Sequence, residues 1–394
     1  MSLKRLPVNI GDFKDLQDNH CLYVDKTEHI YNVFKIGKAF FLSRPRRFGK
    51  SLLLSTINEL LMNRKELFKE TWIYKSDWKW TEHAIIKLDF SAISSDSKAS
   101  FEDSLLGYLE TIAQESGFSL KNEPALSNKT TLLIKQLAAQ KPVAILIDEY
   151  DSALLKQLHN KTEAENIKAT MHAFYSTIKA NNALIACLFI TGISRFAKVS
   201  IFSGMNHITD LTADARATAI CGYTQKELEH NYDGYIERLA NTVSLSKQET
   251  INKLKFWYNG FQFNRVATKI YNPFSITNCF DKQEFMNYWF ISATPSFLVY
   301  VLKNHPENAQ KLLLLETTEA TISTFDNVAI EQYFQNLPML FYQTGYLTIK
   351  NFIPELNIYQ LGYPNFEVRQ SMNTLIEMQN SLLNTHTIQN EKMI

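Results

Sequence analysis

Short apolar runs alternate with longer stretches of helical periodicity in the first half of this chain. Four runs rich in Ile, Val, Leu and Phe end in charged or turn residues, at Lys38–Ser43, Ala84–Phe90, Pro142–Ile147 and Leu184–Ile190. Runs of this length without polar alternation are typical of strands that are buried on both faces of a parallel sheet. The segments between them repeat apolar residues at the spacing of amphipathic helices. This alternation predicts an α/β domain, a parallel sheet with helices on both faces.

The pattern becomes mostly helical after about Ala215. Three helices are expected there, because each amphipathic stretch follows a residue type that caps helices well. A proline in the first turn and a glycine just past the end are further signals of helix limits. The expected N-caps are Thr224, Ser246 and Asn272, with Pro273 in a first turn and Gly260 as a stop.

Strand signals return near the C-terminus. The runs Leu340–Phe352 and Leu356–Pro364 alternate apolar and polar residues around a turn, which predicts a hairpin. The chain is therefore expected to divide into three parts. These are an α/β domain at residues 1–215, a helical second domain at 216–339, and a small β element with the C-terminal tail at 340–394.

Composition indicates an ordinary globular protein, with 45% hydrophobic and 21% charged residues among 394. A formal net charge of +1 gives no overall attraction to nucleic acid or acidic membranes, so a polyanion site would need a local basic patch. The four cysteines form no CxxC pair, which favours a reducing compartment over a zinc or disulfide framework. No secretory signal is evident, and the longest apolar run, Ala183–Ile190, is too short to cross a bilayer. A cytoplasmic protein without membrane spans is expected.

The stretch FFLSRPRRFGKSLLLS, Phe40–Ser55, carries the first candidate chemistry. A phosphate-binding loop, or Walker A motif, has a glycine, four free positions and then Gly-Lys-Ser or Gly-Lys-Thr. Gly49, Lys50 and Ser51 fit this pattern, but Arg44 stands where the first glycine is expected. Lys50 would neutralise the β- and γ-phosphates, and Ser51 would offer its hydroxyl to Mg²⁺. The alternative is a surface turn whose arginines are solvated.

An acidic pair gives the second candidate, in the stretch PVAILIDEYD. An apolar strand ends in Asp148 and Glu149, which resembles a Walker B motif. Asp148 would lie beside the metal ion, and Glu149 would orient and deprotonate the attacking water in ATP hydrolysis. Many strands end in acidic residues without catalytic function, but the combination with the loop favours a nucleotide site. Asp151 is the next candidate if Glu149 is not the base.

Polar residues also follow the next strand, in the stretch LFITGISRF. Ligands of open α/β sheets lie at the carboxyl ends of the strands, so Thr191 and Arg195 are expected to face the same crevice as Lys50 and Asp148. Thr191 would sense the γ-phosphate. Arg195 either balances phosphate charge or is a solvated residue at a helix start.

Several separated motifs together resemble the AAA-ATPase-like family of bacterial and archaeal proteins. They are YVDKTEHI, RPRRFGKS, LIDEYDSAL, ITGISRF and FWYNGF, and the resemblance extends from about Leu6 to Pro364. It implies a P-loop NTPase of the additional-strand, catalytic-glutamate (ASCE) type. Members often carry a C-terminal PD-(D/E)XK nuclease-like domain, which needs metal-binding carboxylates on a small sheet. Too few residues follow Pro364 for such a core, and Glu391-Lys392 lacks the spacing, so this chain is expected to lack the nuclease.

The arginines of the loop leave two interpretations open. The resemblance implies that Arg44 is a family variant, because an arginine commonly replaces the first loop glycine there. Three guanidinium groups within four positions can make forked hydrogen bonds to phosphate, and Pro45 fixes one backbone angle. Arg44 either contacts a phosphate or holds the loop shape with Pro45. The complete nucleotide-binding loop is then Arg44, Pro45, Arg46, Arg47, Phe48, Gly49, Lys50 and Ser51.

These patterns predict an ATP-binding and ATP-hydrolysing protein with ATP and Mg²⁺ as its ligands. The aromatic stretches FWYNGF, YNPFS and NYWF either stack nucleic-acid bases or form core, and the lack of an interleaved Lys/Arg stripe favours core. Two alternatives are a nucleotide-gated binding module without significant hydrolysis, and a nucleic-acid-associated defence or mobile-element protein that has lost its nuclease. A homo-oligomer or a protein partner stays open.

Overall fold

The computed structural model describes residues 3–123, 125–157, 159–195, 201–202, 207–265, 268–293, 318–321 and 337–374. Among these residues, none of the helices has the length and apolar character that a membrane span requires. The expected tail beyond 374, with Glu391-Lys392, lies outside the described residues.

A five-stranded sheet in the order β2-β3-β4-β1-β5 forms the centre of the protein, and all of its strand pairs are parallel. β4 lies between β1 and β3, which is the additional strand expected for the catalytic-glutamate class. The predicted α/β fold is confirmed, although β5 is too short to give a sequence signal. The strands are β1 (Ala39–Ser43), β2 (Ala84–Asp89), β3 (Val143–Asp148), β4 (Ile185–Gly192) and β5 (Thr209–Asp210).

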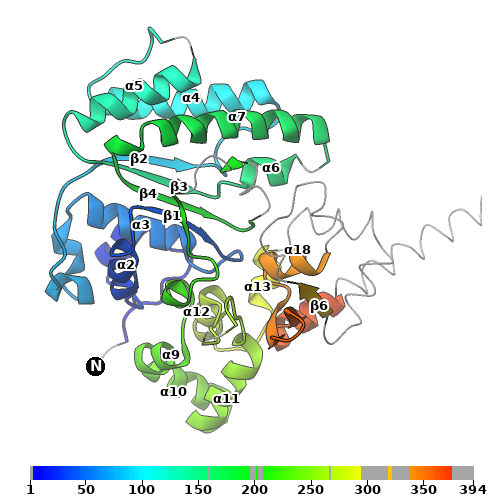
Figure 1. Cartoon of the computed structure of the whole chain (residues 1–394). Helices are drawn as coiled ribbons and strands as arrows, with labels where there is room; N and C mark the ends of the chain where they lie inside the picture. Colours follow the sequence, from blue (N-terminus) through cyan, green and yellow to red (C-terminus); the bar gives the residue numbers. More distant parts are fainter. Residues whose placement is uncertain are drawn as a thin grey trace, which may run out of the picture.

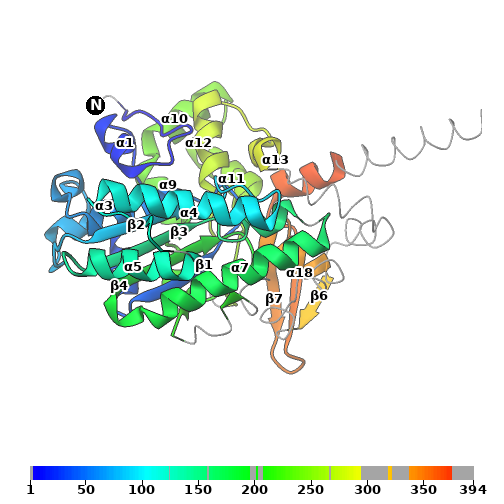
Figure 2. The ribbon, with the colours of Figure 1, turned by 90° about the horizontal axis from the view of Figure 1, so that it is seen from above.

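Helices cover both faces of this sheet, and β1 and β3 are buried at every position as a result. On one face α4, α5 and α7 pack against one another, with α4 against β2 and α5 against β3 (Figures 1 and 2). On the other face α3 contacts β3 and β4. Burial on both faces explains why these strands read as continuous apolar runs. The helices are α1 (Phe13–Asp18), α2 (Thr27–Phe34), α3 (Lys50–Leu61), α4 (Lys98–Glu115), α5 (Leu126–Ala138), α6 (Ser152–Lys156) and α7 (Lys161–Ala180).

Short 3-10 turns connect these elements, at Lys65–Phe68, Trp72–Lys75, Asn182–Leu184 and Ala215–Ala217. A helical region follows, seen at the bottom of Figure 1. Thr224 and Ser246 both form capping boxes, and Asn272 accepts two backbone N–H groups at the start of the next helix. The stretch after Thr224 forms two helices that meet at the buried Tyr232. The helices are α9 (Gln225–Asn231), α10 (Asp233–Thr242), α11 (Lys247–Tyr258), α12 (Pro273–Lys282) and α13 (Tyr288–Ala293).

The C-terminal region forms an antiparallel sheet in the order β6-β8-β7, beside helix α18. The predicted hairpin is confirmed for β7 (Thr348–Ile353) and β8 (Ile358–Gly362), and β6 (Thr318–Thr321) pairs with β8. The first part of the predicted strand Leu340–Phe352 is wrong, because Leu337–Thr344 is helix α18. All residues of this helix except Pro338 are buried, and a short, wholly buried apolar run cannot be assigned to helix or strand from periodicity alone.

Glu367, in the helical residues 366–374, is a fully buried carboxyl in this region. It accepts hydrogen bonds from the Ser275 hydroxyl and from the Trp289 backbone N–H, both at 2.8 Å. Burial raises its pKa to about 8, and these hydrogen bonds only partly oppose the shift. The folded protein therefore holds the proton on Glu367 more firmly than the unfolded chain does.

The stability that this proton contributes is full below the ordinary glutamate pKa and is lost as the pH rises through about 8. We expect the Tm of the wild type to fall with pH across this window more steeply than that of Glu367→Gln, because glutamine stays neutral. Thermal unfolding at a series of pH values measures both slopes. Glu355→Gln, an exposed glutamate in the same region, should keep the wild-type slope. Equal slopes for the wild type and Glu367→Gln would contradict the assignment.

Candidate functional site

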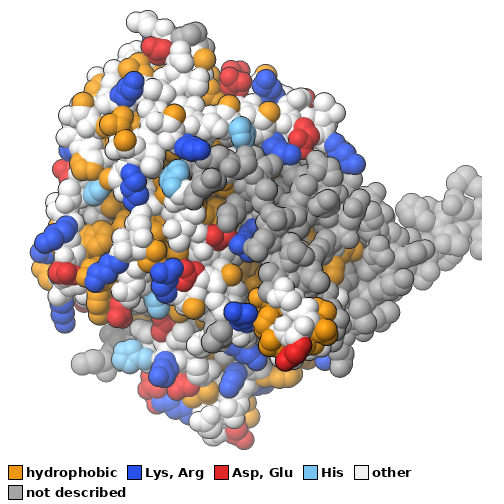
Figure 3. All heavy atoms as spheres, viewed as in Figure 1, with side chains coloured by type: hydrophobic (Ala, Val, Ile, Leu, Met, Phe, Trp, Pro, Cys, Tyr) orange, Lys and Arg blue, Asp and Glu red, His pale blue; other side chains and the backbone are white. Residues whose placement is uncertain are grey.

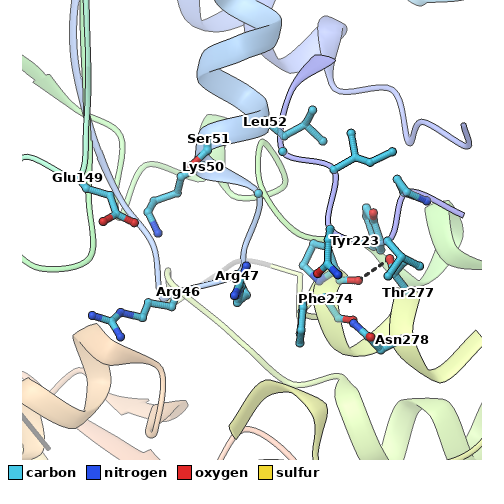
Figure 4. A pocket seen from close by; sticks show the side chains of 17 residues that line it. Arg46, Arg47, Lys50, Ser51, Leu52, Glu149, Tyr223, Phe274, Thr277 and Asn278 are labelled. Atoms are coloured by element: carbon cyan, nitrogen blue, oxygen red, sulfur yellow. Dashed lines mark hydrogen bonds between the residues drawn. The ribbon is translucent and has the colours of Figure 1, made fainter. Parts of the chain in front are cut away.

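A cavity of about 520 Å³ lies at the carboxyl end of β1, where the parallel sheet meets the helical region. Four separate parts of the chain line it, together with Glu149 (Figure 4). Lys50 and Glu149 lie on one side of it, Tyr223, Phe274 and Asn278 lie on the other, and Arg47 lies between. The lining residues are Pro7, Val8, Asn9, Ile10, Gly11, Arg46, Arg47, Gly49, Lys50, Ser51, Leu52, Glu149, Tyr223, Pro273, Phe274, Thr277 and Asn278.

The loop between β1 and α3 forms the first wall of the cavity. Arg47 (φ 65°) and Gly49 (φ 88°) both have left-handed backbone conformations, which turn the chain sharply into the helix. Gly49 is the N-cap of α3 and has no side chain to accept a hydrogen bond from the first turn. The first N–H groups of α3 therefore lack a side-chain cap, which is the arrangement that suits an anion.

Lys50 is buried beside this loop, with 6% of its surface exposed. Its ammonium donates hydrogen bonds to the carbonyl oxygens of Arg44 and Pro45, each at 3.0 Å. Burial lowers the pKa of Lys50, while the nearby carboxylates of Asp148 and Glu149 oppose that shift. The lysine thus lies beside the loop at one end of the cavity, held by neutral acceptors that an anionic oxygen can replace.

Asp148 and Glu149 follow one another at the end of β3 but differ in setting. Asp148 is buried, and its Oδ1 accepts the backbone N–H of Glu149 at 3.0 Å and the hydroxyl of Thr191. Glu149 lines the cavity and has a left-handed backbone conformation (φ 49°). This conformation is uncommon for glutamate, and residues with such strained backbones are found most often at functional sites. Burial raises the pKa of Glu149, and Lys50 opposes the shift. A carboxylate whose pKa is raised by burial is a stronger base.

Asp151 has a different environment from Glu149, and it does not line the cavity. It is fully buried and accepts hydrogen bonds from the backbone N–H groups of Ile193 and Ser194, at 3.1 and 2.8 Å, and from the Ser194 hydroxyl at 2.6 Å. A Cβ at Gly192 would lie 2.5 Å from the ring of Tyr150. Tyr150 and Asp151 thus fix the loop after β4, and this position offers no support for Asp151 as the base.

Neither predicted sensor residue lines the cavity, and Thr191 lies inside β4 whereas Arg195 follows it. Thr191 is fully buried, and its hydroxyl donates to Asp148. Arg195 forms an ion pair with Asp210 at 2.6 Å, and its backbone N–H donates to the side chain of Gln343 at 3.0 Å. Thr191 can therefore act on the site through Asp148. The sensor functions of both residues stay predictions.

Arg44, in the place of the first glycine, is also fully buried and lies outside the cavity lining. Its guanidinium donates hydrogen bonds to the carbonyl oxygens of Ser43 and Thr212, both at 2.8 Å, and of Ala217 at 3.2 Å. It also lies 4.2 Å from the ring centre of Phe263. Of the two interpretations of Arg44, this geometry favours holding the loop shape over a phosphate contact.

We expect Arg44→Gly to lower the free energy of unfolding by about 3–5 kcal/mol, because three buried carbonyls lose a donor and each carbonyl left unsatisfied costs about 1–3 kcal/mol. ATP affinity should fall as well, since the loop loses its anchor to the segment after β5. Thermal unfolding and calorimetric titration measure the two effects. Arg44→Lys should recover part of the stability. An unchanged Tm with weakened ATP binding would instead favour a direct phosphate contact.

The second wall of the cavity was not anticipated from the sequence. It combines the N-terminal residues 7–11 with Tyr223 and the first turns of α12. The Asn278 amide donates to the Phe274 carbonyl at 2.8 Å, and the Arg47 guanidinium lies 4.9 Å from the ring centre of Phe274. The stretch YNPFS signals a helix start, but nothing in its pattern places that helix opposite the phosphate loop. The aromatic rings of Tyr223 and Phe274 and the amide of Asn278 could bind a planar ligand with polar groups on its edge.

The oxygen atoms near Lys50 fit a magnesium ion that is shared with a phosphate ligand. Within the described part of the chain, no group of three or more His, Cys, Asp or Glu side chains could hold a metal alone. Among the same residues, Oδ2 of Asp148 and the hydroxyl of Ser51 accept no protein hydrogen bond, and Ser51 lines the cavity whereas Asp148 lies outside its lining. Mg²⁺ in proteins is commonly held by one or two such oxygen ligands together with substrate phosphates.

Comparisons with known proteins agree with this geometry. The model of a family described as predicted AAA-ATPase (AAA-ATPase-like) matches residues 7–202. A protein of Azotobacter chroococcum mcd 1, described as an uncharacterized protein in the vnfD 5′ region, is 32% identical over 378 residues. That match covers 95% of this chain and 70% of the Azotobacter protein. It therefore includes the parts of the cavity that lie beyond residue 202.

Proposed function

Since this chain belongs to the predicted AAA-ATPase family, we propose that it binds ATP with Mg²⁺ in the cavity beside Lys50 and hydrolyses the terminal phosphate. At the level of the family, the chain has an ATP-binding P-loop function. The observation that carries the proposal is the position of Lys50 and Glu149 on one side of a single cavity (Figure 4). One supplies a cation for phosphate and the other supplies a base for water.

The phosphate end would use groups that the loop and β3 bring together. The uncapped N-terminus of α3 and the Lys50 ammonium would bind the phosphates. Ser51 and Asp148 would hold the metal ion, which when bound neutralises charge on the phosphate oxygens. Glu149 would orient the attacking water and accept its proton. Thr191 would keep Asp148 in place through their hydrogen bond.

The nucleoside end would use the second wall. Tyr223 and Phe274 present aromatic rings to the cavity, and Asn278 presents an amide whose Nδ2 is already oriented by the Phe274 carbonyl. Planar rings bind bases by stacking, and an amide oxygen accepts hydrogen bonds from an exocyclic amine. The base would then lie between residues 7–11 and α12, so that the helical domain (216–339) would complete a site begun by the α/β domain (1–215).

The distribution of charged side chains on the face shown in Figure 3 does not favour nucleic-acid binding as a second function. Figure 3 shows Lys and Arg interspersed with Asp and Glu over the described part of that face, without a stripe of one sign. This distribution agrees with the formal net charge of +1. Nucleic-acid binding would therefore need an observation beyond charge.

The test is phosphate release by the purified chain with ATP and Mg²⁺, beside ATP binding by calorimetry. We expect saturable binding and turnover that stops when the metal is chelated. Binding without turnover would reduce the function to a nucleotide-gated module. No binding of ATP would refute the proposal. Assays with added single-stranded and duplex DNA and RNA show whether a nucleic acid stimulates turnover.

A further inference from the structure

The phosphate loop is also held by Trp289, a residue that does not line the cavity. Three successive loop carbonyls have protein donors. Lys50 donates to those of Arg44 and Pro45, and the indole N–H of Trp289 donates to that of Arg46 at 3.1 Å. Trp289 is 1% exposed and comes from α13, far from the loop in sequence. Hydrogen bonds from Lys50 and from Trp289 thus hold the loop.

The ring of Trp289 is fixed by neighbours from the C-terminal region. The ring of Tyr346 lies 5.0 Å away, centre to centre. Gly345, with φ 92°, brings its backbone so close that an added Cβ would lie 2.7 Å from Pro45 Cβ and 3.4 Å from Trp289. The turn between α18 and β7 therefore contacts both the loop and the tryptophan that holds it.

A second connection runs from the backbone of Trp289 to α12. The Trp289 N–H donates to Glu367, and Glu367 also accepts the hydroxyl of Ser275, one residue after Phe274 in the cavity wall. One tryptophan thus contacts the loop through its indole and the opposite wall through a buried carboxyl. A change on either side of the cavity has a direct physical route to Trp289.

We propose that Trp289 is a positioning residue for the nucleotide site: its indole holds the phosphate loop and links the conformation of the loop to that of the turn between α18 and β7. This inference rests on the proposed function. When Lys50 turns from the loop carbonyls to a phosphate, two of the three carbonyls lose their donor, and the bond from Trp289 remains to keep the loop in shape. The turn at residues 345–347 is then the part of the C-terminal region whose order depends on whether nucleotide is bound.

The variant that tests this inference is Trp289→Phe, which keeps a ring but removes the indole N–H. We expect its Kd for ATP to rise about 2–10-fold, the range for one net hydrogen bond. The wild type should change its tryptophan emission on binding ATP, and Trp289→Phe should lose that change. Trp257→Phe is the matched control, because Trp257 packs on Phe285 and Phe366. It should keep both the affinity and the change in emission.

Hydrogen exchange on the wild type gives a second measurement that needs no variant to fold. Amides of residues 345–347 should exchange more slowly with ATP bound, while those of the hairpin tip 354–357 should not change. Unchanged exchange at 345–347, or full affinity and an unchanged emission response in Trp289→Phe, would overturn this inference alone. Failure of the wild type to bind ATP would overturn the proposed function and this inference with it.

Discussion

Replacing Glu149 by glutamine is expected to lower kcat for ATP by about 10²–10⁴-fold, the usual contribution of a positioned general base. Glutamine keeps the size and the hydrogen bonds of the side chain but cannot accept the proton. The Kd for ATP should stay close to that of the wild type, so that the loss appears in kcat and not in binding. Phosphate release under saturating ATP measures the first quantity, and calorimetry measures the second.

The pH profile adds an independent readout. The base must be ionised, and burial raises the pKa of Glu149, so the acid limb of kcat should lie at higher pH than an ordinary glutamate gives. Asp103→Asn is the control, because Asp103 is an exposed carboxylate of α4 that does not line the cavity. It should keep wild-type turnover. Undiminished turnover in Glu149→Gln would show that another group activates the water.

Replacing Lys50 by alanine is expected to weaken ATP binding by more than about 100-fold. The lysine would make charge-assisted hydrogen bonds to two phosphates, and each such bond contributes about 1.5–3 kcal/mol. The change also removes the donor of the Arg44 and Pro45 carbonyls, so the empty loop should become less ordered. Calorimetric titration with ATP measures the affinity, and thermal unfolding shows how much stability the loop loses.

Lys121→Ala provides the control for lost charge, because Lys121 is exposed and outside the cavity. Its affinity for ATP should equal that of the wild type. Lys50→Ala should also lose turnover in step with binding at subsaturating ATP. Wild-type affinity in folded Lys50→Ala would remove the basis for a phosphate site in this loop.

Much of the sheet was predictable because its signals are local. Each central strand is an apolar run with buried neighbours on both faces, so the pattern alone gives its position to within a residue or two. Helix starts were equally clear where a capping side chain is present, as at Ser246. The pair Asp148 and Glu149 could be located for the same reason, since it directly ends a strand.

What could not be predicted depends on contacts between distant segments. Arg44 reads as a phosphate ligand because of its neighbours, yet its three acceptors include the carbonyls of Thr212 and Ala217, which only the fold brings near. Helix α18 was misread because the alternation of strand β7 was extended back into it. The sequence predicted that a helix starts at Asn272–Pro273, but it did not predict that this helix forms part of the second wall of the cavity.

Part of the second wall of the cavity, Tyr223 and α12, comes from a region of the chain that is separate from the phosphate loop. The region that matches the family, residues 7–202, contains the phosphate loop and Glu149, whereas Tyr223 and α12 lie beyond it. Under the proposed function, substitutions at Asn278 are expected to alter which nucleoside is preferred while leaving Lys50 and Glu149 in place. A fragment ending near residue 215 would lose, together with this wall, the Ala217 carbonyl that binds Arg44 and the Trp289 indole that binds Arg46.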